Sequence, residues 1–341
     1  MKKRAFKIVV NDQNVNTKPL EYTYSNTKGI LLRLAKGKAL VTFSRASNVN
    51  QETIFARNDI FVDALNKIFV LHLMKYGNPL KFKSITVYAN DEALYSCDSS
   101  DAMPIETYCD DWHGSVMFCK EFEKVSTYYL SKPKSNQGRL HAALHAYLIA
   151  CGKSDNAVRF AYLWMAVNAM YGYLADSVYG FAKQEKLNRP KRTEIVCIEL
   201  FHAYLNPRIN KSEYRTNWSK NSRKDINKKL TACISRICDS ITENDKQAIQ
   251  TVLCENNVPK YMSAKSYLAL ELGYELRCNL FHGEKPIRLC GLKGDYESKR
   301  YKVVNSLLLE IIEEHLYKWL LLAGEGDALS SEVQGLASCF L

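Results

Sequence analysis

AYLWMAVNAMYGY (residues 161–173) places apolar side chains on nearly every side of a predicted helix, which is typical of a helix buried in a bundle. A later run, VNSLLLEIIEEHLYKW (304–319), carries apolar residues at i, i+3 and i+4 spacing and predicts a long helix with one core-facing stripe. Between and around these two runs every long segment has a helical pattern. Helices are therefore expected over 138–151, 156–174, 193–205, 222–240, 243–254, 262–282 and 298–323.

The first hundred residues have a different, mixed pattern. Short runs rich in β-formers are separated by Asn, Thr, Gly and Lys, and they predict strands over 5–10, 20–24, 30–35, 39–44 and 80–88. Asp59 is placed to cap a helix over 60–76, which Gly77 and Pro79 would end. We therefore expect an α+β N-terminal domain (1–98), a linker with a short helix (99–136), an all-α domain (137–324) and a loosely ordered tail (325–341).

Basic residues are concentrated in one part of the chain. The net charge is +11 at pH 7, and residues 183–229 hold 13 Lys and Arg against 5 Asp and Glu. Such an excess favours polyanions such as nucleic acid or an anionic membrane surface, although a solvated Lys-rich face has the same composition. The candidate contacts in this segment are Arg189, Lys191, Arg192, Arg223 and Lys224.

Several classes of protein are disfavoured. The 11 cysteines include no Cys-x-x-Cys pair, so a structural zinc site is not expected, and unpaired thiols fit the cytoplasm. His141 and His145 have a metal-compatible spacing but no nearby Cys or acidic partner, so neither a metal nor a cofactor is predicted. No apolar run approaches the roughly 18 residues that a membrane span needs. Neither a Gly-x-Ser-x-Gly elbow nor a P-loop occurs.

The segment RCNLFHG (277–283) is the main candidate for chemistry. Arginine holds phosphate through a rigid fork of donors, and histidine moves protons near neutral pH. Asn279 and His282 are three residues apart and share a helix face, whereas Arg277 is offset from His282 by about 140°. Gly283 is placed to end the helix, which leaves His282 within reach of solvent. The alternative is a capping histidine beside a surface arginine.

Two further polar features bear on this site. Asn168 interrupts the apolar helix, and burying an unpaired amide costs about 1–3 kcal/mol. We therefore expect Asn168 to have a partner, either on a neighbouring helix or in a polar active site. Arg139 and His145 have nearly the same spacing as Arg277 and His282, but they lack the intervening Asn and the helix-ending Gly.

LWMAVNAMYGY together with RCNLFHGEK resembles the HEPN superfamily, particularly its Apea-like branch. The superfamily is marked by Arg, four to six residues, then His, commonly with a polar residue next but one after the Arg. Arg277, Asn279 and His282 match this mark. An upstream aromatic helix with an Asn followed by a Tyr is also typical, and Asn168 and Tyr171 match it. The resemblance covers about residues 137–323, and the basic insert is longer than a minimal bundle needs.

The resemblance implies a metal-independent endoribonuclease that uses the 2′-hydroxyl of RNA and leaves a 2′,3′-cyclic phosphate. His282 would act as general base or acid, Arg277 would hold the scissile phosphate, and Asn279 would orient one of them. Asn168 and Tyr171 would support the site. It also implies a homodimer with a composite active site, and a role in bacterial defence or toxin systems. An antitoxin or trigger partner would bind residues 1–98.

Two other functions stay open. One is a HEPN-type module that dimerises or binds RNA without cutting it. The other is a basic, two-domain nucleic-acid-binding regulator, although no clear helix-turn-helix is present in the sequence.

Overall fold

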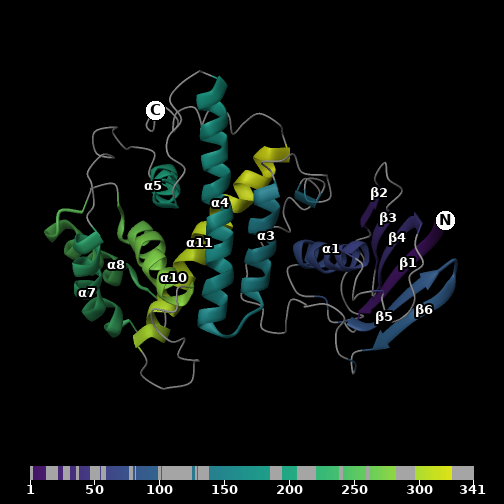
Figure 1. Ribbon diagram of the computed structural model, residues 1–341. Helices are drawn as coiled ribbons and strands as arrows, with labels where there is room; N and C mark the ends of the chain where they lie inside the picture. The colour runs from purple at the N-terminus through teal and green to yellow at the C-terminus, as the bar shows by residue number, and fades with distance from the viewer. Residues whose placement is uncertain are drawn as a thin grey trace. The chain divides into compact units, whose positions relative to one another are not determined.

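The computed structural model describes residues 3–12, 22–25, 31–35, 38–46, 54, 59–76, 80, 82–98, 101, 125–126, 129, 138–184, 194–205, 220–237, 241–258, 262–281 and 296–324. The chain divides into two compact units, Met1–Ser131 and Lys132–Leu341 (Figure 1). Among the described helices, none is long and apolar enough to cross a membrane.

The N-terminal unit contains a six-stranded antiparallel sheet in the order β2-β3-β4-β1-β5-β6. β1 lies between two partners, so that Val9 is opposite Leu40 on one side and Thr86 on the other. The bounds are Lys3–Asp12 for β1, Tyr22–Ser25 for β2, Leu31–Ala35 for β3, Lys38–Ala46 for β4, Phe82–Ala89 for β5 and Glu92–Asp98 for β6.

One helix, α1 (Asp59–Tyr76), packs against this sheet. Phe6 of β1 meets Phe61 of α1 edge-on, with 5.0 Å between the ring centroids. Ile8 and Val10 are buried and share the face of β1 with Phe6, because alternate residues of a strand point the same way. The expected α+β N-terminal part is confirmed.

β6 was not predicted from the sequence. Its residues are mostly half-buried or exposed, so the strand lacks the apolar alternation that marked the others. It is joined to β5 by Asn90 and Asp91, which have φ values of 50° and 67°. Asn and Asp tolerate this left-handed conformation, and such a pair is typical of a tight hairpin turn. The Asn-Asp dipeptide was the signal that the sequence offered.

The second unit is a helical bundle (Figure 1). Its long helices are α3 (Gly138–Cys151), α4 (Asn156–Gln184), α5 (Glu194–Leu205), α7 (Lys220–Arg236), α8 (Glu243–Glu255) and α11 (Tyr296–Gly324). One further helical run is made of three parts: α9 (Ala264–Ser266), the π-helix η3 (Tyr267–Leu272) and α10 (Gly273–Phe281). The expected all-α part is thus confirmed at the level of its helices.

The helix α4 is longer than expected, ending at Gln184 instead of at 174. Beyond 174 the side chains of Val178 and Tyr179 are still buried, so the apolar face continues for about one more turn. Within this helix, Gly172 lies against the side chain of Arg139 of α3.

The core of the bundle is aromatic. Trp164 and Trp319 are almost fully buried, and the ring of Trp319 packs on Phe201 and Tyr204 of α5. The Trp319 indole N–H also donates to the Tyr204 hydroxyl, so that α5 and α11 are joined by packing and by a hydrogen bond. This cluster satisfies the polar atom of a buried indole, as a stable core requires.

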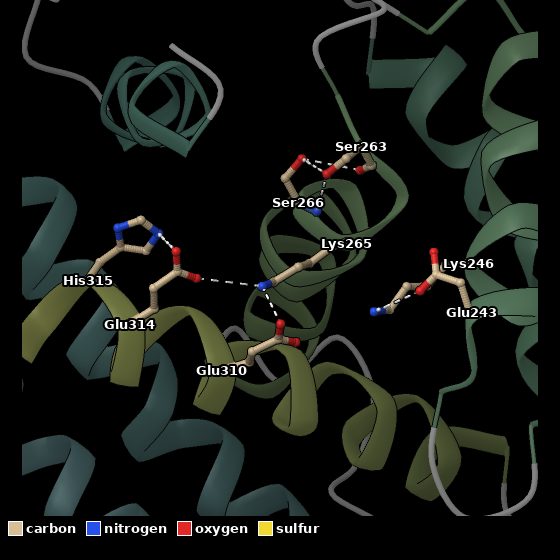
Figure 2. A network of polar contacts seen from close by, with 8 residues as sticks. All are labelled: Glu243, Lys246, Ser263, Lys265, Ser266, Glu310, Glu314 and His315. Atoms are coloured by element: carbon tan, nitrogen blue, oxygen red, sulfur yellow. Dashed lines mark hydrogen bonds and ion pairs between the residues drawn. The ribbon is translucent and has the colours of Figure 1, made fainter. Parts of the chain in front are cut away.

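The start of the α9–η3–α10 run is held to α11 by charge. Figure 2 shows Lys265 between two acidic residues of α11, with Nζ 2.6 Å from Glu310 Oε1 and 3.9 Å from Glu314 Oε2. Ser263 caps the run by accepting a hydrogen bond from the backbone N–H of Ser266. The first turn of this run is therefore fixed both by its cap and by α11.

Candidate active site

Three helices bring Tyr171, Glu194 and Arg277 together. Arg277 Nη2 of α10 lies 3.5 Å from Glu194 Oε1, at the first residue of α5. The Tyr171 hydroxyl of α4 donates to the same carboxylate oxygen at 3.4 Å. The side chains of Arg277 and Glu194 are 23% and 30% exposed, so the group is reachable from solvent but partly desolvated. We call these three residues the Arg277 cluster.

The electrostatics of the Arg277 cluster keep the arginine charged and the tyrosine neutral. Burial raises the pKa of Tyr171 well above its ordinary value, and the nearby Glu194 carboxylate raises it further. Burial alone would lower the pKa of Arg277, but Glu194, Cys278 and Tyr274 together outweigh that effect and the pKa is raised. A neutral donor and a permanent cation thus share one carboxylate.

Glu194 is a site residue that sequence reasoning missed. An acidic residue in the first turn of a helix is favoured by the helix dipole, so Glu194 has an ordinary reason to be there. The sequence carried no sign that Glu194 would contact Tyr171, 23 positions before it, and Arg277, 83 positions after it. Its place two residues after the basic run at 189–192 was the one unusual feature.

Asn168 is exposed, so the expectation that it would be a buried amide with a partner is wrong. The helix α4 is not covered on all sides: Val158 is 43% and Met165 is 51% exposed. Asn168 lies one turn from both Trp164 and Tyr171 on the same helix face. Trp164 packs near Tyr274 of α10 and Tyr171 reaches the Arg277 cluster, so Asn168 borders α10 at the surface.

Asn279 faces away from Arg277. Two residues of an α-helix are about 200° apart, and Asn279 is 9% exposed whereas Arg277 meets the Glu194 carboxylate near the surface. The Nδ2 atom of Asn279 is buried and finds no hydrogen-bond partner within the described part of the chain. A buried amide donor of this kind is costly without an acceptor. His282, the third residue of the motif, lies outside the described residues.

An exposed aromatic ring borders the arginine. Phe281 is 53% exposed, and the guanidinium carbon of Arg277 lies 6.0 Å from the centre of its ring. A cation at this distance is at the outer limit of attraction to an aromatic face. An exposed ring next to a cation is a surface on which an unpaired base can stack.

The predicted basic residues fall into two groups. Arg189, Lys191 and Arg192 lie outside the described residues. Arg223 of α7 is 20% exposed, and its Nη1 lies 3.3 Å from Glu271 Oε2, whereas Lys224 is exposed on the same helix. Neighbouring residues of one helix thus have different surroundings: Arg223 pairs with a buried carboxylate, whereas Lys224 presents its charge to solvent.

Arg139, which has a similar spacing to a histidine, is engaged elsewhere. Its Nε lies 2.6 Å from Asp176 Oδ2, an ion pair that joins α3 to α4. Within the ranges described above, no three His, Cys, Asp or Glu side chains are grouped so that they could hold a metal ion.

Comparison of the chain with models of known protein families, with curated proteins and with solved structures found no match.

Proposed function

We propose that the helical unit is a HEPN-type, metal-independent endoribonuclease that cleaves RNA through the RNA's own 2′-hydroxyl. The observation that carries the proposal is the Arg277 cluster. Three helices hold a charged, partly desolvated guanidinium, five residues before His282 in the sequence. A cation in such surroundings interacts more strongly with a phosphate than one in bulk water does.

The reaction needs few groups. The 2′-oxygen of RNA attacks the adjacent phosphorus, the bond from phosphorus to the 5′-oxygen breaks, and a 2′,3′-cyclic phosphate forms. A general base takes the proton of the 2′-hydroxyl, and a general acid gives one to the departing 5′-oxygen. We assign these proton transfers to His282 and the binding of the phosphoryl oxygens to Arg277. A homodimer would provide one histidine for each transfer.

The surroundings of Arg277 give the other residues their roles. Glu194 and Tyr171 orient the guanidinium, and an incoming phosphate would compete with Glu194 for it. Asn168 and Phe281 lie at the exposed rim, where an unpaired base can be contacted. Lys224, with Arg189, Lys191 and Arg192, would bind the RNA backbone. By the resemblance we further propose a defence or toxin effector, with a trigger partner on residues 1–98.

The test is RNA cleavage in EDTA by four proteins: the wild type, Arg277→Ala, His282→Ala and Arg139→Ala. The last is a matched control, because Arg139 also precedes a histidine but pairs with Asp176. The wild type and Arg139→Ala should cleave mixed RNA to 2′,3′-cyclic ends, while the other two should lose at least about 100-fold in rate. Equal cleavage by wild type and His282→Ala would refute the catalytic assignment.

A non-catalytic RNA-binding module is the second candidate, and one observation favours it. Glu194 occupies an edge of the Arg277 guanidinium, as a structural ion pair would. This function predicts that RNA stays intact with every variant. It also predicts that charge reversal of Lys224 weakens RNA binding while His282→Ala does not.

A further inference from the structure

A π-helical turn interrupts the helix that carries Arg277. The run from Ala264 to Phe281 is α-helical at both ends, but Tyr267–Leu272 form a π-helix, and all six of its residues are buried. A π-turn closes its hydrogen bonds over one residue more than an α-turn does, and such turns are frequent at functional sites. It therefore changes the direction in which every later side chain points.

Glu271, in this turn, is a buried carboxylate held by two other helices. Its Oε1 lies 3.5 Å from His202 Nε2 of α5, and its Oε2 lies 3.3 Å from Arg223 Nη1 of α7. Burial alone would raise the pKa of Glu271, but His202 and Arg223 outweigh it and the pKa is lowered, so the carboxylate is ionised. Moving this charge away from its partners would leave it buried without compensation.

Gly273 fixes the residue that follows the turn. A Cβ atom at Gly273 would lie 2.8 Å from Cζ3 of the Trp164 ring, which is closer than real Cβ contacts come. Trp164 is buried, so the ring cannot easily move aside. Upstream, Lys265 is bound to α11 (Figure 2), and downstream Arg300 Nη2 lies 3.1 Å from Glu275 Oε1.

The extra residue of the turn sets the rotation of α10. One residue corresponds to about 100° of rotation on an α-helix. If the run were α-helical throughout, each residue of α10 would take the place that its successor now has. Buried Leu276 would lie where Arg277 now meets Glu194, and half-buried Cys278 would move to the buried place of Asn279.

We propose that Glu271 is a positioning residue which, with Gly273, keeps the π-turn and so presents Arg277 to Glu194 and Tyr171. The effect of the π-turn on catalysis rests on the proposed function. Its effect on the rotation of α10 does not depend on that function. The Glu271 side chain contacts His202 and Arg223, and Gly273 lies against Trp164, so both residues act on Arg277 through the course of the helix and not by a side-chain contact.

Cysteine alkylation tests the rotation without any RNA. Full-length wild type, Glu271→Gln and Gly273→Ala are treated with iodoacetamide, and mass spectrometry gives the labelling rate of Cys278 relative to exposed Cys254 on α8. Loss of the π-turn buries Cys278, so this ratio should fall about tenfold in both variants. Glu243→Gln is the matched control, because it removes a carboxylate that is 73% exposed and pairs with Lys246 on the same helix, and it should leave the ratio unchanged.

A deletion gives the converse test. Removing Ala269 takes the extra residue out of the turn. The run can then be α-helical throughout while Arg277 still faces Glu194, as it does in the wild type. The ratio should stay at the wild-type value in the deletion variant, and the deletion should restore the ratio in Glu271→Gln. If the Cys278 to Cys254 labelling ratio rises in Glu271→Gln and Gly273→Ala, the helix is locally loosened and the proposal is overturned. A labelling ratio that stays unchanged in both variants also overturns it. Should both fail to fold, a lowered ratio in the deletion variant alone overturns it.

RNA cleavage separates this inference from the proposed function. If the wild type cleaves RNA, Glu271→Gln should lower kcat about tenfold with KM unchanged, because Lys224 and the other backbone contacts are untouched. If the wild type cleaves no RNA, the proposed function fails while the alkylation ratio still decides whether Glu271 sets the rotation of α10.

Discussion

Glu194 has two opposing effects on Arg277. It holds the guanidinium at the meeting point of three helices, and it competes with any phosphate for the same donors. Glu194→Gln should therefore bind RNA more tightly but cleave it about tenfold more slowly, because Arg277 is less well oriented. Tyr171→Phe is the matched control: it removes one hydroxyl from the cluster and should change the cleavage rate less.

Single-turnover cleavage and a binding titration would measure both effects. Unchanged values in Glu194→Gln would show that the carboxylate neither orients Arg277 nor competes with phosphate.

The ionised Glu271 should make stability depend on pH. Its pKa is lower in the folded protein than its ordinary value of 4.5, so its charge stabilises the fold. That contribution is complete above pH 4.5 and is lost as the pH falls through the lowered pKa. Glu271→Gln should therefore be less stable than the wild type by about 2 kcal/mol at pH 7, and the difference should shrink below pH 4.5.

Urea unfolding at a series of pH values measures this difference. The surface variant Glu310→Gln should stay within about 0.5 kcal/mol of the wild type at pH 7. A constant gap for Glu271→Gln across the series would mean that its carboxylate is not the source of the stability.

At the residue scale the sequence identified part of the candidate site. Tyr171 and Arg277 were singled out and lie in one cluster, because an aromatic helix and an arginine near a helix end are visible as local patterns. Glu194 and Glu271 were missed, since their partners are distant in the chain. The burial of Asn168 was predicted wrongly. Met165 and Asn168 lie on a solvent-exposed face of α4, and a helix that is apolar on nearly every side does not show in its sequence which face is exposed.

At the scale of one element, α8 offers a direct measure of capping. The Thr242 side chain accepts a hydrogen bond from the backbone N–H of Asp245, and the Asp245 carboxylate accepts one from the backbone N–H of Thr242. Thr242→Ala should lower the free energy of unfolding by about 1 kcal/mol. Thr251→Ala, an exposed change on the same helix, should cost less than about 0.5 kcal/mol. Denaturant unfolding compares the two, and equal losses would contradict the capping argument.

Element boundaries were predictable where chemistry marks them. α3 begins and ends as expected, and α8 begins at the capping signal that the sequence carries. The π-turn was not predictable from the sequence. Every residue from Tyr267 to Leu272 is buried, so no alternation of buried and exposed positions distinguishes a π-helical period from an α-helical one. The turn depends on His202, Arg223 and Trp164, which lie on other helices.

At the scale of the whole molecule, the excess positive charge should make RNA binding salt-dependent. Lys224 and Lys228 are exposed one turn apart on α7. Reversing both to Glu should weaken RNA binding and reduce the slope of log affinity against log salt by about 0.7 for each lost contact. Lys246→Glu on α8, where the lysine pairs with Glu243, is the control and should change the slope little. An unchanged slope in the double variant would exclude α7 from the RNA interface.

The order of an α+β part followed by an all-α part was predictable, because the change from a two-residue to a 3.6-residue apolar period is a property of the whole sequence. The sheet order was not, since no local signal says which strands pair. The RNA, the dimer and the trigger partner stay predictions, because each depends on a second molecule.

The position of β1 matters during synthesis. β1 is an inner strand, and its second neighbour, β5, ends at Ala89. A ribosome adds about 5–20 residues per second, so β1 waits for several seconds with one edge unpaired. During that interval the unpaired backbone N–H and C=O groups of β1 can pair with other nascent chains on the same messenger RNA. Slowed translation between residues 46 and 82 should therefore increase aggregation of the newly made protein.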